Sequence, residues 1–458
     1  MARRRARSRG AVPRRLCQSG FFGRRQRVSR EAPRGLESEL SMAAPPLSAK
    51  FAAFRKSLPA KPRIYINGCA GEAVGLAEAM ADAPELAAGV TFVGAWVPGI
   101  NLTDWASLHA EAQAETTFLP PSLRPSFEDG RTRILPMAYS ATWDWIRTTP
   151  LDGAVLMVSP PDNDGNISLG ISPDFGPAIL ARTNLPVLGI LNPQMPAVPN
   201  SVTVHQSRFA ALVEHERALI EVAPQRLAPG FQRIAAHVAG LVPERGVLQF
   251  GIGNVQQAVL AAVSGLRGVS IHSGIVSDPV ADLLDTDDTL RVATGVAVGT
   301  KRLYDRLAKE TRVRFLPVSE THFVHKLAAI SRFTAINSVI EVDLFGQANA
   351  EFIGGRQVSG TGGLTDFLRG ARASEGGVGI TALLSTAQSG AVSRIVPRLP
   401  QVATSVTRAD MDWVVTEHGA VRLHGLDLDG RASALISIAD PTHQAALANA
   451  WDEMRRGM

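Results

Sequence analysis

A glycine-rich loop in the second half of the chain has the composition of a site for an anion or an oxyanion. The loop reads Ser359-Gly360-Thr361-Gly362-Gly363 and lies beside a plausible helix start. Because it carries almost no side chains, its backbone N–H groups can approach an anion or the oxyanion that develops when a carbonyl is attacked. The loop is therefore our first candidate for a reactive site.

A second glycine turn occurs upstream. Residues 247–250 read as a buried strand, Gly251-Ile252-Gly253 as a tight turn, and residues 255–263 as a helix with an apolar stripe. Two glycine turns beside strand ends suggest that both contribute to one shared active site.

Other uses of these turns lack the residues that they need. A dinucleotide fold would place glycine where Gln256 stands and an acidic residue about 20 positions further on, and neither is present. The chain contains no phosphate-loop run, and its ten histidines show no metal-ligand spacing. We expect no metal.

The elements around the turns alternate between strands and helices. Strands are expected at 153–159, 186–191, 313–318, 335–344 and 412–416. The segments 49–82 and 232–265 both read as helix, linker, apolar strand, glycine turn and helix, which indicates two related α/β domains with a boundary near residues 215–230. In largely parallel sheets, ligands bind beyond the carboxyl ends of the strands, where both glycine turns would lie.

Charge is concentrated at the start of the chain. Residues 1–41 contain 12 arginines and three glutamates, a local charge of +9, so the remaining residues carry −4 of the chain's total of +5. The body is thus slightly acidic, which disfavours nucleic-acid binding by a folded module. We expect residues 1–41 to be a disordered Arg-rich extension; a transit peptide and an over-extended start before Met42 are both open interpretations.

Cysteine content and hydropathy set the expected compartment. Cys17 and Cys69 are the two cysteines, which excludes a disulfide framework and a cysteine-based metal site. No apolar run reaches the roughly 18 residues of a membrane span. We expect a soluble cytoplasmic protein that binds neither membranes nor nucleic acid.

Six runs in order along the chain carry a specific resemblance. They are VLMVSPPDNDGNISLGIS (155–172), LQFGIGNVQQAVL (248–260), IHSGIVSDPVADLLD (271–285), INSVIEVDLFGQANAEFIG (336–354), SGTGGLTDFLRGA (359–371) and VVTEHGAVRLHGLDLDGRASALISIADP (414–441). With these runs the chain resembles the acetyl-CoA hydrolase/transferase family.

The resemblance implies an α/β fold of two tandem CoA-transferase-type (NagB/RpiA-like) domains with mainly parallel sheets, at 46–222 and 226–458. It implies transfer of CoA from a short-chain acyl-CoA to a small carboxylic acid of the acetate or 4-hydroxybutyrate type. The thioester is a substrate and no cofactor is needed, and the resemblance is compatible with a homodimer. The expected oxyanion and CoA-binding groups are the backbone at Ile252, Gly253, Gly360, Gly362 and Gly363.

The chain departs from the family at the nucleophile. The family's glutamate attacks the acyl-CoA carbonyl and forms an anhydride, and its position in the motif corresponds here to Gly274, in His272-Ser273-Gly274. Glu417, at the end of an apolar strand, is the best remaining acid. Further acids in family-like runs are Glu341, Asp343 and Glu351.

Three functions therefore stay open. They are a transferase that uses a substitute acid, a hydrolase in which water replaces the missing glutamate, and an acyl-CoA-binding protein without catalysis. A fourth class, nucleic-acid binding through the arginine-rich extension, would show as salt-sensitive affinity.

Overall fold

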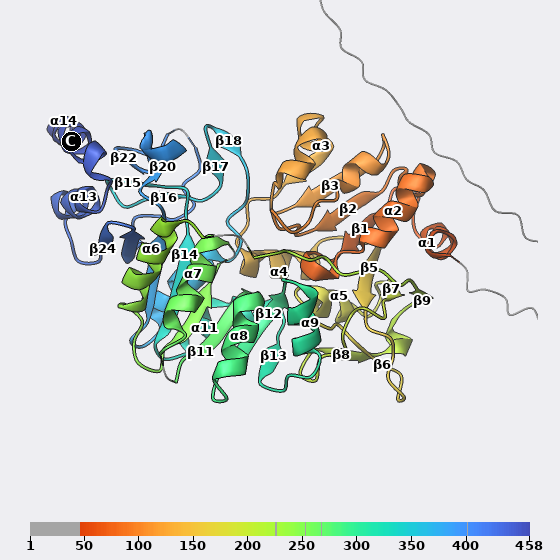
Figure 1. Ribbon diagram of the computed structural model, residues 1–458. Coiled ribbons are helices and arrows are strands. Elements are labelled where there is room, and N and C mark those ends of the chain that lie inside the picture. Colours follow the sequence, from red (N-terminus) through yellow and green to blue (C-terminus); the bar gives the residue numbers. More distant parts are fainter. Residues whose placement is uncertain (1–45, 225–226, 252, 267, 401) are drawn as a thin grey trace, which may run out of the picture. The chain divides into compact units, whose positions relative to one another are not determined.

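Two mainly parallel sheets organise the chain. The computed structural model describes residues 46–224, 227–251, 253–266, 268–400 and 402–458, which belong to one compact unit. The extension over residues 1–41 and the candidate residue Ile252 lie outside the described residues. Figure 1 shows the sheets with their helices.

The first sheet has seven parallel strands in the order β4-β3-β2-β1-β5-β7-β9. The inner strand β5, which pairs with the central strand β1, is buried at every position, as expected of a strand covered on both faces. The bounds are β1 Arg63–Ile66, β2 Thr91–Gly94, β3 Gln113–Thr116, β4 Thr132–Ile134, β5 Gly153–Val158, β7 Val187–Leu191 and β9 Ala211–Glu214.

The second sheet has eight strands in the order β13-β12-β11-β10-β14-β19-β23-β24, with the last pair antiparallel and the others parallel. The bounds are β10 Val247–Phe250, β11 Ser270–Val276, β12 Val292–Ala297, β13 Val313–Phe315, β14 Phe333–Ser338, β19 Val378–Ala382, β23 Trp413–Thr416 and β24 Gly419–Arg422.

The two sheets share one strand order. In each, the first strand is central, the next three follow outward on one side, and the later strands follow on the other. The segments 49–82 and 232–265, whose sequences read alike, contain α1-β1-α2 and α6-β10-α7. The expected α/β architecture with two tandem domains is confirmed.

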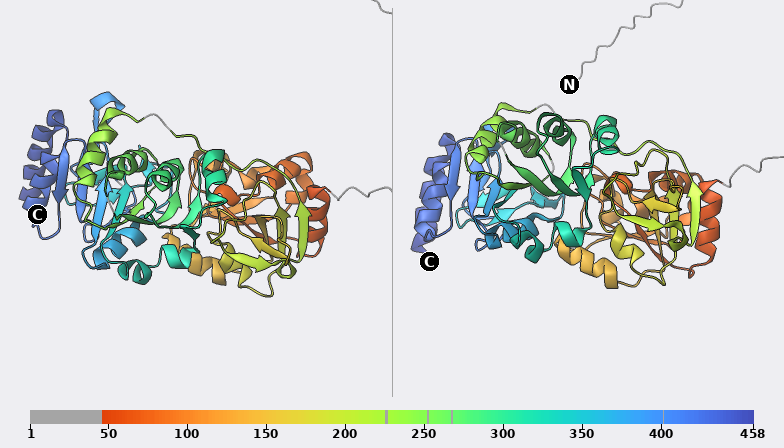
Figure 2. Two further views of the ribbon diagram at one scale, coloured as in Figure 1. Left: turned by 60° about the horizontal axis from the view of Figure 1, so that its bottom comes forward. Right: turned by 90° about the horizontal axis from the view of Figure 1, so that it is seen from below.

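The helices lie against the sheets. In the second sheet, α6, α7 and α8 cover one face, and α11 and α12 cover the other (Figure 2). The bounds are α1 Leu47–Lys56, α2 Val74–Asp82, α3 Arg124–Glu128, α4 Tyr139–Thr148, α5 Gly176–Leu180, α6 Pro229–Ala239, α7 Asn254–Val263, α8 Asp278–Thr286, α9 Lys301–Leu307, α10 Val318–Thr321, α11 Val324–Ala328, α12 Leu364–Ala373, α13 Leu428–Ser437 and α14 Pro441–Arg456.

Short strands complete the fold outside the two sheets. One small sheet has the order β16-β15-β22, and three further pairs are β6-β8, β17-β18 and β20-β21. The bounds are β6 Asn166–Ser168, β8 Thr203–His205, β15 Glu341–Asp343, β16 Ala348–Asn349, β17 Phe352–Ile353, β18 Arg356–Gln357, β20 Thr386–Ala387, β21 Val392–Ser393 and β22 Ile395–Val396.

Two predicted strands were wrong in extent. The strand expected at 335–344 is interrupted after Ser338, and β15 then pairs with β16 and β22 in the small sheet. The strand expected at 313–318 ends at Phe315, because Pro317, which has no backbone N–H, precedes the short helix α10. At both points a strand ends and the backbone turns away at its carboxyl end, which is where the cavity described below lies.

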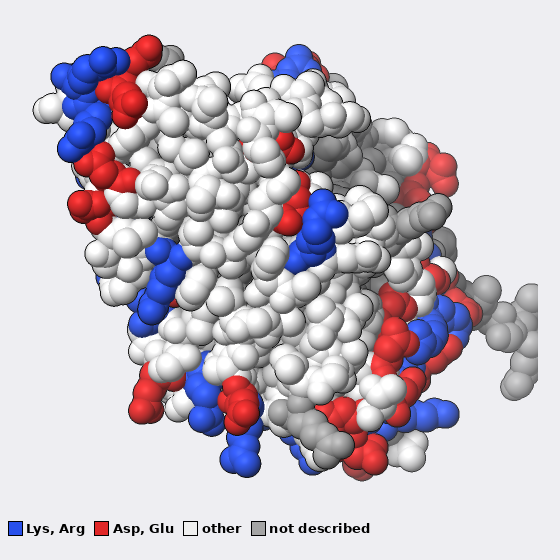
Figure 3. All heavy atoms as spheres, turned by 60° about the vertical axis from the view of Figure 1, so that its left-hand side comes forward, with Lys and Arg blue, Asp and Glu red and all other residues white. Residues whose placement is uncertain are grey.

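Surface charge and helix length relate to two expectations from the sequence, namely a slightly acidic body and no membrane-spanning segment. On the face shown in Figure 3, basic and acidic side chains are interspersed over a largely uncharged surface. Within the described residues, no helix is both long and apolar enough to cross a membrane.

Candidate active site

A cavity of about 230 Å³ lies beyond the carboxyl ends of strands from both sheets. From the first half it is lined by residues that follow β1, β2 and β3, and from the second half by the ends of β10 and β14 and by the glycine-rich loop. The strand order reverses between β10 and β14, which is where open α/β sheets bind ligands. The lining residues are Cys69, Val97, Pro98, Phe118, Tyr139, Asp174, Gln249, Phe250, Gly251, Gly274, Ile275, Val296, His322, Asn337, Ser338, Ala350, Ser359, Gly360, Thr361, Gly362, Gly363, Leu364 and Phe367.

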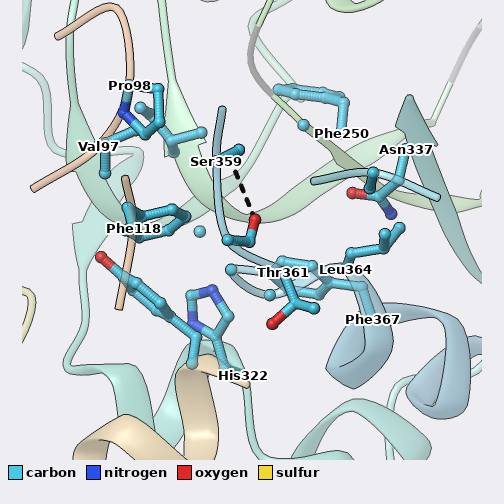
Figure 4. Close-up of a pocket in the computed structure, with 18 of the residues that line it drawn as sticks. Val97, Pro98, Phe118, Phe250, His322, Asn337, Ser359, Thr361, Leu364 and Phe367 are labelled. Atoms are coloured by element: carbon cyan, nitrogen blue, oxygen red, sulfur yellow. Dashed lines mark hydrogen bonds between the residues drawn. The ribbon is translucent and has the colours of Figure 1, made fainter. Parts of the chain in front are cut away.

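The glycine-rich loop 359–363 crosses the cavity and contacts the first half of the chain. Figure 4 shows Ser359 and Thr361 of this loop between Phe118 and Asn337. A Cβ atom on Gly360 would lie 2.1 Å from the carbonyl oxygen of Thr117, so only glycine allows this close approach. The loop is therefore fitted against the first half by its lack of side chains.

Hydrogen bonds at the start of α4 hold the same loop in place. The Tyr139 N–H donates to the Gly362 carbonyl at 3.0 Å. The Ser140 backbone N–H and hydroxyl donate to the Asp366 carboxylate at 3.0 and 2.6 Å. Burial raises the pKa of Asp366, and the two bonds from Ser140 oppose that rise. The first turn of α4 thus fixes both the loop and the start of α12.

The upstream glycine turn divides between two cavities. Gly251 lines the same cavity as Gly360, Gly362 and Gly363. Gly253, with φ of 111°, is the N-cap residue just before α7 and lines a neighbouring cavity of about 180 Å³, which shares Pro98 and Ile275 with the first. The structure therefore brings part of each predicted turn to one place.

Gly274 lies in β11 and lines the cavity beside His322. A Cβ atom on Gly274 would lie 2.8 Å from both Cε1 and Nε2 of His322, which is closer than packed atoms approach. Gly274 does not have a left-handed φ, so the neighbouring imidazole and not the backbone requires glycine here. The space next to residue 274 is filled by His322.

The His322 imidazole is tightly enclosed. Its ring centroid lies 4.8 Å from that of Tyr139 and 4.6 Å from that of Phe367, and its Nδ1 shares a 2.8 Å hydrogen bond with the Thr321 hydroxyl. Burial lowers the pKa of His322 to about 3, and His272 adds to that effect. His322 is therefore neutral at physiological pH.

Asp174 contributes the acid of the cavity wall. Among the described residues that line the cavity, it alone carries a carboxyl group. The side chain is 2% exposed and accepts a 3.1 Å hydrogen bond from the Tyr139 hydroxyl. Burial raises the pKa of Asp174 to about 7, and the bond from Tyr139 partly opposes this rise.

The acidic residues proposed from the sequence do not line this cavity. Glu417 accepts hydrogen bonds from the backbone N–H and hydroxyl of Ser385 at 2.8 and 2.9 Å and is not among the residues that line the cavity. The other three acids are also engaged outside the cavity, through Asn349 for Glu341, Gln347 for Asp343 and Ser405 for Glu351. His272 and Ser273 precede Gly274 in β11 but do not line the cavity; the Ser273 hydroxyl donates to the Phe250 carbonyl.

Sequence reasoning did not identify Asp174, Tyr139 or His322. Asp174 stands two residues beyond the family-like run that ends at Ser172, so a slightly longer comparison would have included it. No local pattern marks Tyr139 or His322, because their position depends on tertiary packing: α4 packs against α10, and α10 packs against β11 and β12 of the second sheet.

The chain is similar to proteins that act on CoA thioesters. The model of the acetyl-CoA hydrolase/transferase C-terminal domain matches residues 299–451. A 4-hydroxybutyrate coenzyme A transferase of Clostridium kluyveri is 36% identical over 310 residues, which cover 66% of this chain and 72% of the relative. A butyryl-CoA:acetate CoA-transferase of Anaerostipes caccae is 31% identical over 339 residues, 69% of this chain and 76% of that protein.

Solved structures have the same fold. RipA from Yersinia pestis matches with a TM-score of 0.80 and 26% identity over 88% of this chain and 96% of that chain. A 4-hydroxybutyrate CoA-transferase from Porphyromonas gingivalis matches with a TM-score of 0.73 and 29% identity over 89% of this chain and 97% of that chain.

Proposed function

Because the chain belongs to the acetyl-CoA hydrolase/transferase family, we propose that its cavity binds a short-chain acyl-CoA and that the thioester is cleaved there. Relatives named as CoA-transferases and as acetyl-CoA hydrolases support CoA transfer or hydrolysis as the general chemistry. The cavity of about 230 Å³ has room for a short acyl group.

The glycine-rich loop supplies the groups that the chemistry needs. When a thioester carbonyl is attacked, its oxygen becomes an oxyanion, which preorganised backbone N–H groups stabilise. The N–H groups of Gly360, Gly362 and Gly363 are the candidates within the cavity, in a loop that α4 holds through Gly362, and Gly251 adds a second segment of bare backbone. Gly253 and Ile252 remain candidates for contacts with the CoA portion.

Water is the proposed acceptor. By resemblance, Gly274 corresponds to the family's nucleophilic glutamate, and a glycine cannot form an acyl anhydride. The observation that carries the proposal is the position of His322: its ring lies against Gly274, so no other side chain can project from that point. We infer hydrolysis of the acyl-CoA to the free acid and CoA.

CoA transfer to a small carboxylic acid of the acetate or 4-hydroxybutyrate type is the second candidate. The names of the relatives favour it, and Asp174 is a carboxyl group in the cavity that a covalent route would require. The third candidate, binding without catalysis, follows if neither water nor an acid accepts the acyl group.

One assay distinguishes the three. Purified protein is incubated with a panel of short acyl-CoA thioesters, with and without acetate or 4-hydroxybutyrate, and both CoA and new acyl-CoA are quantified. Free CoA without an acceptor means hydrolysis, and a new acyl-CoA with an acceptor means transfer. Binding with neither product means a binding protein, and no binding would refute the proposal.

A pair of variants tests the location of the site. Gly362→Ala places a methyl group about 3.2 Å from the Phe118 ring inside the cavity, on a backbone with φ of 53°. Gly355→Ala is the matched control, because Gly355 has φ of 77° and no atom within 4 Å of a Cβ. Acyl-CoA affinity, measured by calorimetry, should fall for Gly362→Ala and stay unchanged for Gly355→Ala.

A further inference from the structure

Asp174 is placed where a proton would have to move during cleavage of a thioester. It lies in the loop between β6 and α5 and lines the cavity, and its carbonyl accepts the N–H of Val318 at 3.3 Å, across the two halves of the chain. No described residue donates a hydrogen bond to Oδ1 of Asp174, while Oδ2 is held by Tyr139. One carboxyl oxygen is thus free of protein partners among the described residues.

Tyr139 connects this carboxyl group to the glycine-rich loop. Its hydroxyl donates to Asp174 Oδ2 at 3.1 Å, and its backbone N–H donates to the Gly362 carbonyl at 3.0 Å. A single residue therefore fixes the acid and the proposed oxyanion-binding backbone relative to each other. Proton transfer requires this kind of fixed geometry.

Two residues of the cavity wall have a strained backbone. Asp174 has φ of 38° and Cys69 has φ of 51°, values that residues other than glycine rarely adopt. Each such conformation is unfavourable and persists only where the surrounding structure enforces it, which occurs most often at functional sites. Both residues line the same cavity. Backbone strain therefore distinguishes this wall of the cavity, independently of the charge of Asp174.

The groups around Asp174 are uncharged. Those that face it are Tyr139 from α4, Tyr65 from β1 and Cys69 after β1, and His322, beyond the Tyr139 ring, is neutral. Burial is the main cause that raises the pKa of Asp174 to about 7, and no cation among the described residues counters it. The carboxyl group can therefore exchange a proton near neutral pH, as an efficient general base and acid must.

We propose that Asp174 is the proton-transfer residue of the cavity. This inference deepens the proposed function and depends on it. The Asp174 carboxylate takes a proton from water as the water oxygen bonds to the thioester carbon, and the carbonyl π electrons move onto oxygen. The oxyanion then collapses, the C–S bond breaks with its electron pair on sulfur, and the Asp174 carboxyl group returns the proton to the CoA thiolate. Acyl-CoA and water thus yield a carboxylic acid and CoA, with the enzyme unchanged.

The test compares Asp174→Asn with Tyr139→Phe. Asparagine keeps the shape of aspartate and tolerates a left-handed φ, so the backbone at 174 is preserved. Asp164→Asn, at an exposed position in the preceding turn between β5 and β6, is the matched control. Circular dichroism confirms folding, and the pH profile of CoA release and acyl-CoA affinity are measured for each protein.

We expect Asp174→Asn to lower kcat about 10²–10⁴-fold and retain acyl-CoA binding, as loss of a general base would. In the wild-type protein kcat should rise with pH about the pKa of Asp174, near 7. Tyr139→Phe removes a hydrogen bond that stabilises the carboxylate, so this rise should move to higher pH. Asp164→Asn should match the wild type.

Infrared difference spectroscopy gives a readout that does not depend on turnover. A carboxyl group that titrates near neutral pH in the wild-type protein should disappear in Asp174→Asn. Wild-type cleavage that survives unchanged in Asp174→Asn overturns the assignment of Asp174 alone. Absence of cleavage by the wild-type protein overturns the proposed hydrolysis and the proton-transfer role together.

Discussion

The contact between Gly274 and His322 predicts a change of sign in the effect of one mutation. In Gly274→Ala, the new methyl group would lie 2.8 Å from two atoms of an imidazole that Tyr139 and Phe367 hold on either side. Because Tyr139 and Phe367 restrict the movement of the ring, this overpacking should destabilise the protein by about 1–3 kcal/mol. In a His322→Ala background the obstacle is gone. Alanine in a strand is about 0.5–1 kcal/mol more favourable than glycine, so the same substitution should then stabilise.

The coupling is measured with a double-mutant cycle. Urea unfolding followed by circular dichroism gives the free energy of unfolding for the wild type, both single variants and the double variant. The two expected effects of Gly274→Ala differ by about 1.5–4 kcal/mol, which is well above the error of additivity for independent sites. Gly379→Ala, in β19, is the control, because its Cβ would meet Leu368 at an ordinary 3.4 Å.

An equal effect of Gly274→Ala in both backgrounds would refute the reasoning that His322 requires glycine at position 274.

The same two positions also define a gain-of-function experiment. Gly274→Glu alone should fold poorly, because the carboxylate would be driven into the ring, whereas Gly274→Glu with His322→Ala has space for the side chain. A CoA adduct on residue 274 of the double variant, detected by mass spectrometry, would show that the space had been restored to a nucleophile.

Two further predictions concern buried acids. Burial raises the pKa of Asp174 from 3.8 to about 7, so the native state keeps a proton that the unfolded chain releases, and the free energy of unfolding should fall by about 4 kcal/mol as pH rises from about 4 to above 7. The free energy of unfolding of Asp174→Asn should not fall with pH in this way. If urea unfolding shows that this variant still loses the same stability across that pH range, the raised pKa does not belong to Asp174. Ser140→Ala removes the 2.6 Å hydrogen bond to Asp366 and should cost about 1–3 kcal/mol in urea unfolding. Thr148→Ala, near the exposed end of the same helix, serves as its control, and equal losses in the two variants would argue against a specific role for Ser140.

The elements of the fold were predictable where pattern and length agreed. The buried strand 247–250 and the helix at 255–263 follow from local apolar patterning, and the observed β10 and α7 match them closely. The strand at 335–344 was not predictable in its full course, since its second part leaves the main sheet to pair with residues more than 50 positions away. Tertiary pairing there overrides local propensity.

The site was predictable only in part, for a similar reason. Glycine-rich loops can be recognised in a sequence, because glycine is required wherever backbones approach closely. The contact between Gly274 and His322 has no comparable pattern in the sequence, because it forms only when α10 packs against β11. Asp174 likewise becomes distinctive only through burial and the bond from Tyr139.

The shared strand order of the two sheets has a consequence for biosynthesis. Every strand pair within each sheet joins residues of the same half, so the first half can complete its sheet while the second is still being made. In that interval the part of the cavity lining that the second half supplies is missing, so Asp174 should be more open to water than in the complete protein, and an aspartate in contact with water is ionised at neutral pH. Docking of the second half would then require uptake of a proton by Asp174. Assembly of the newly made protein should accordingly be faster in mildly acidic than in alkaline solution.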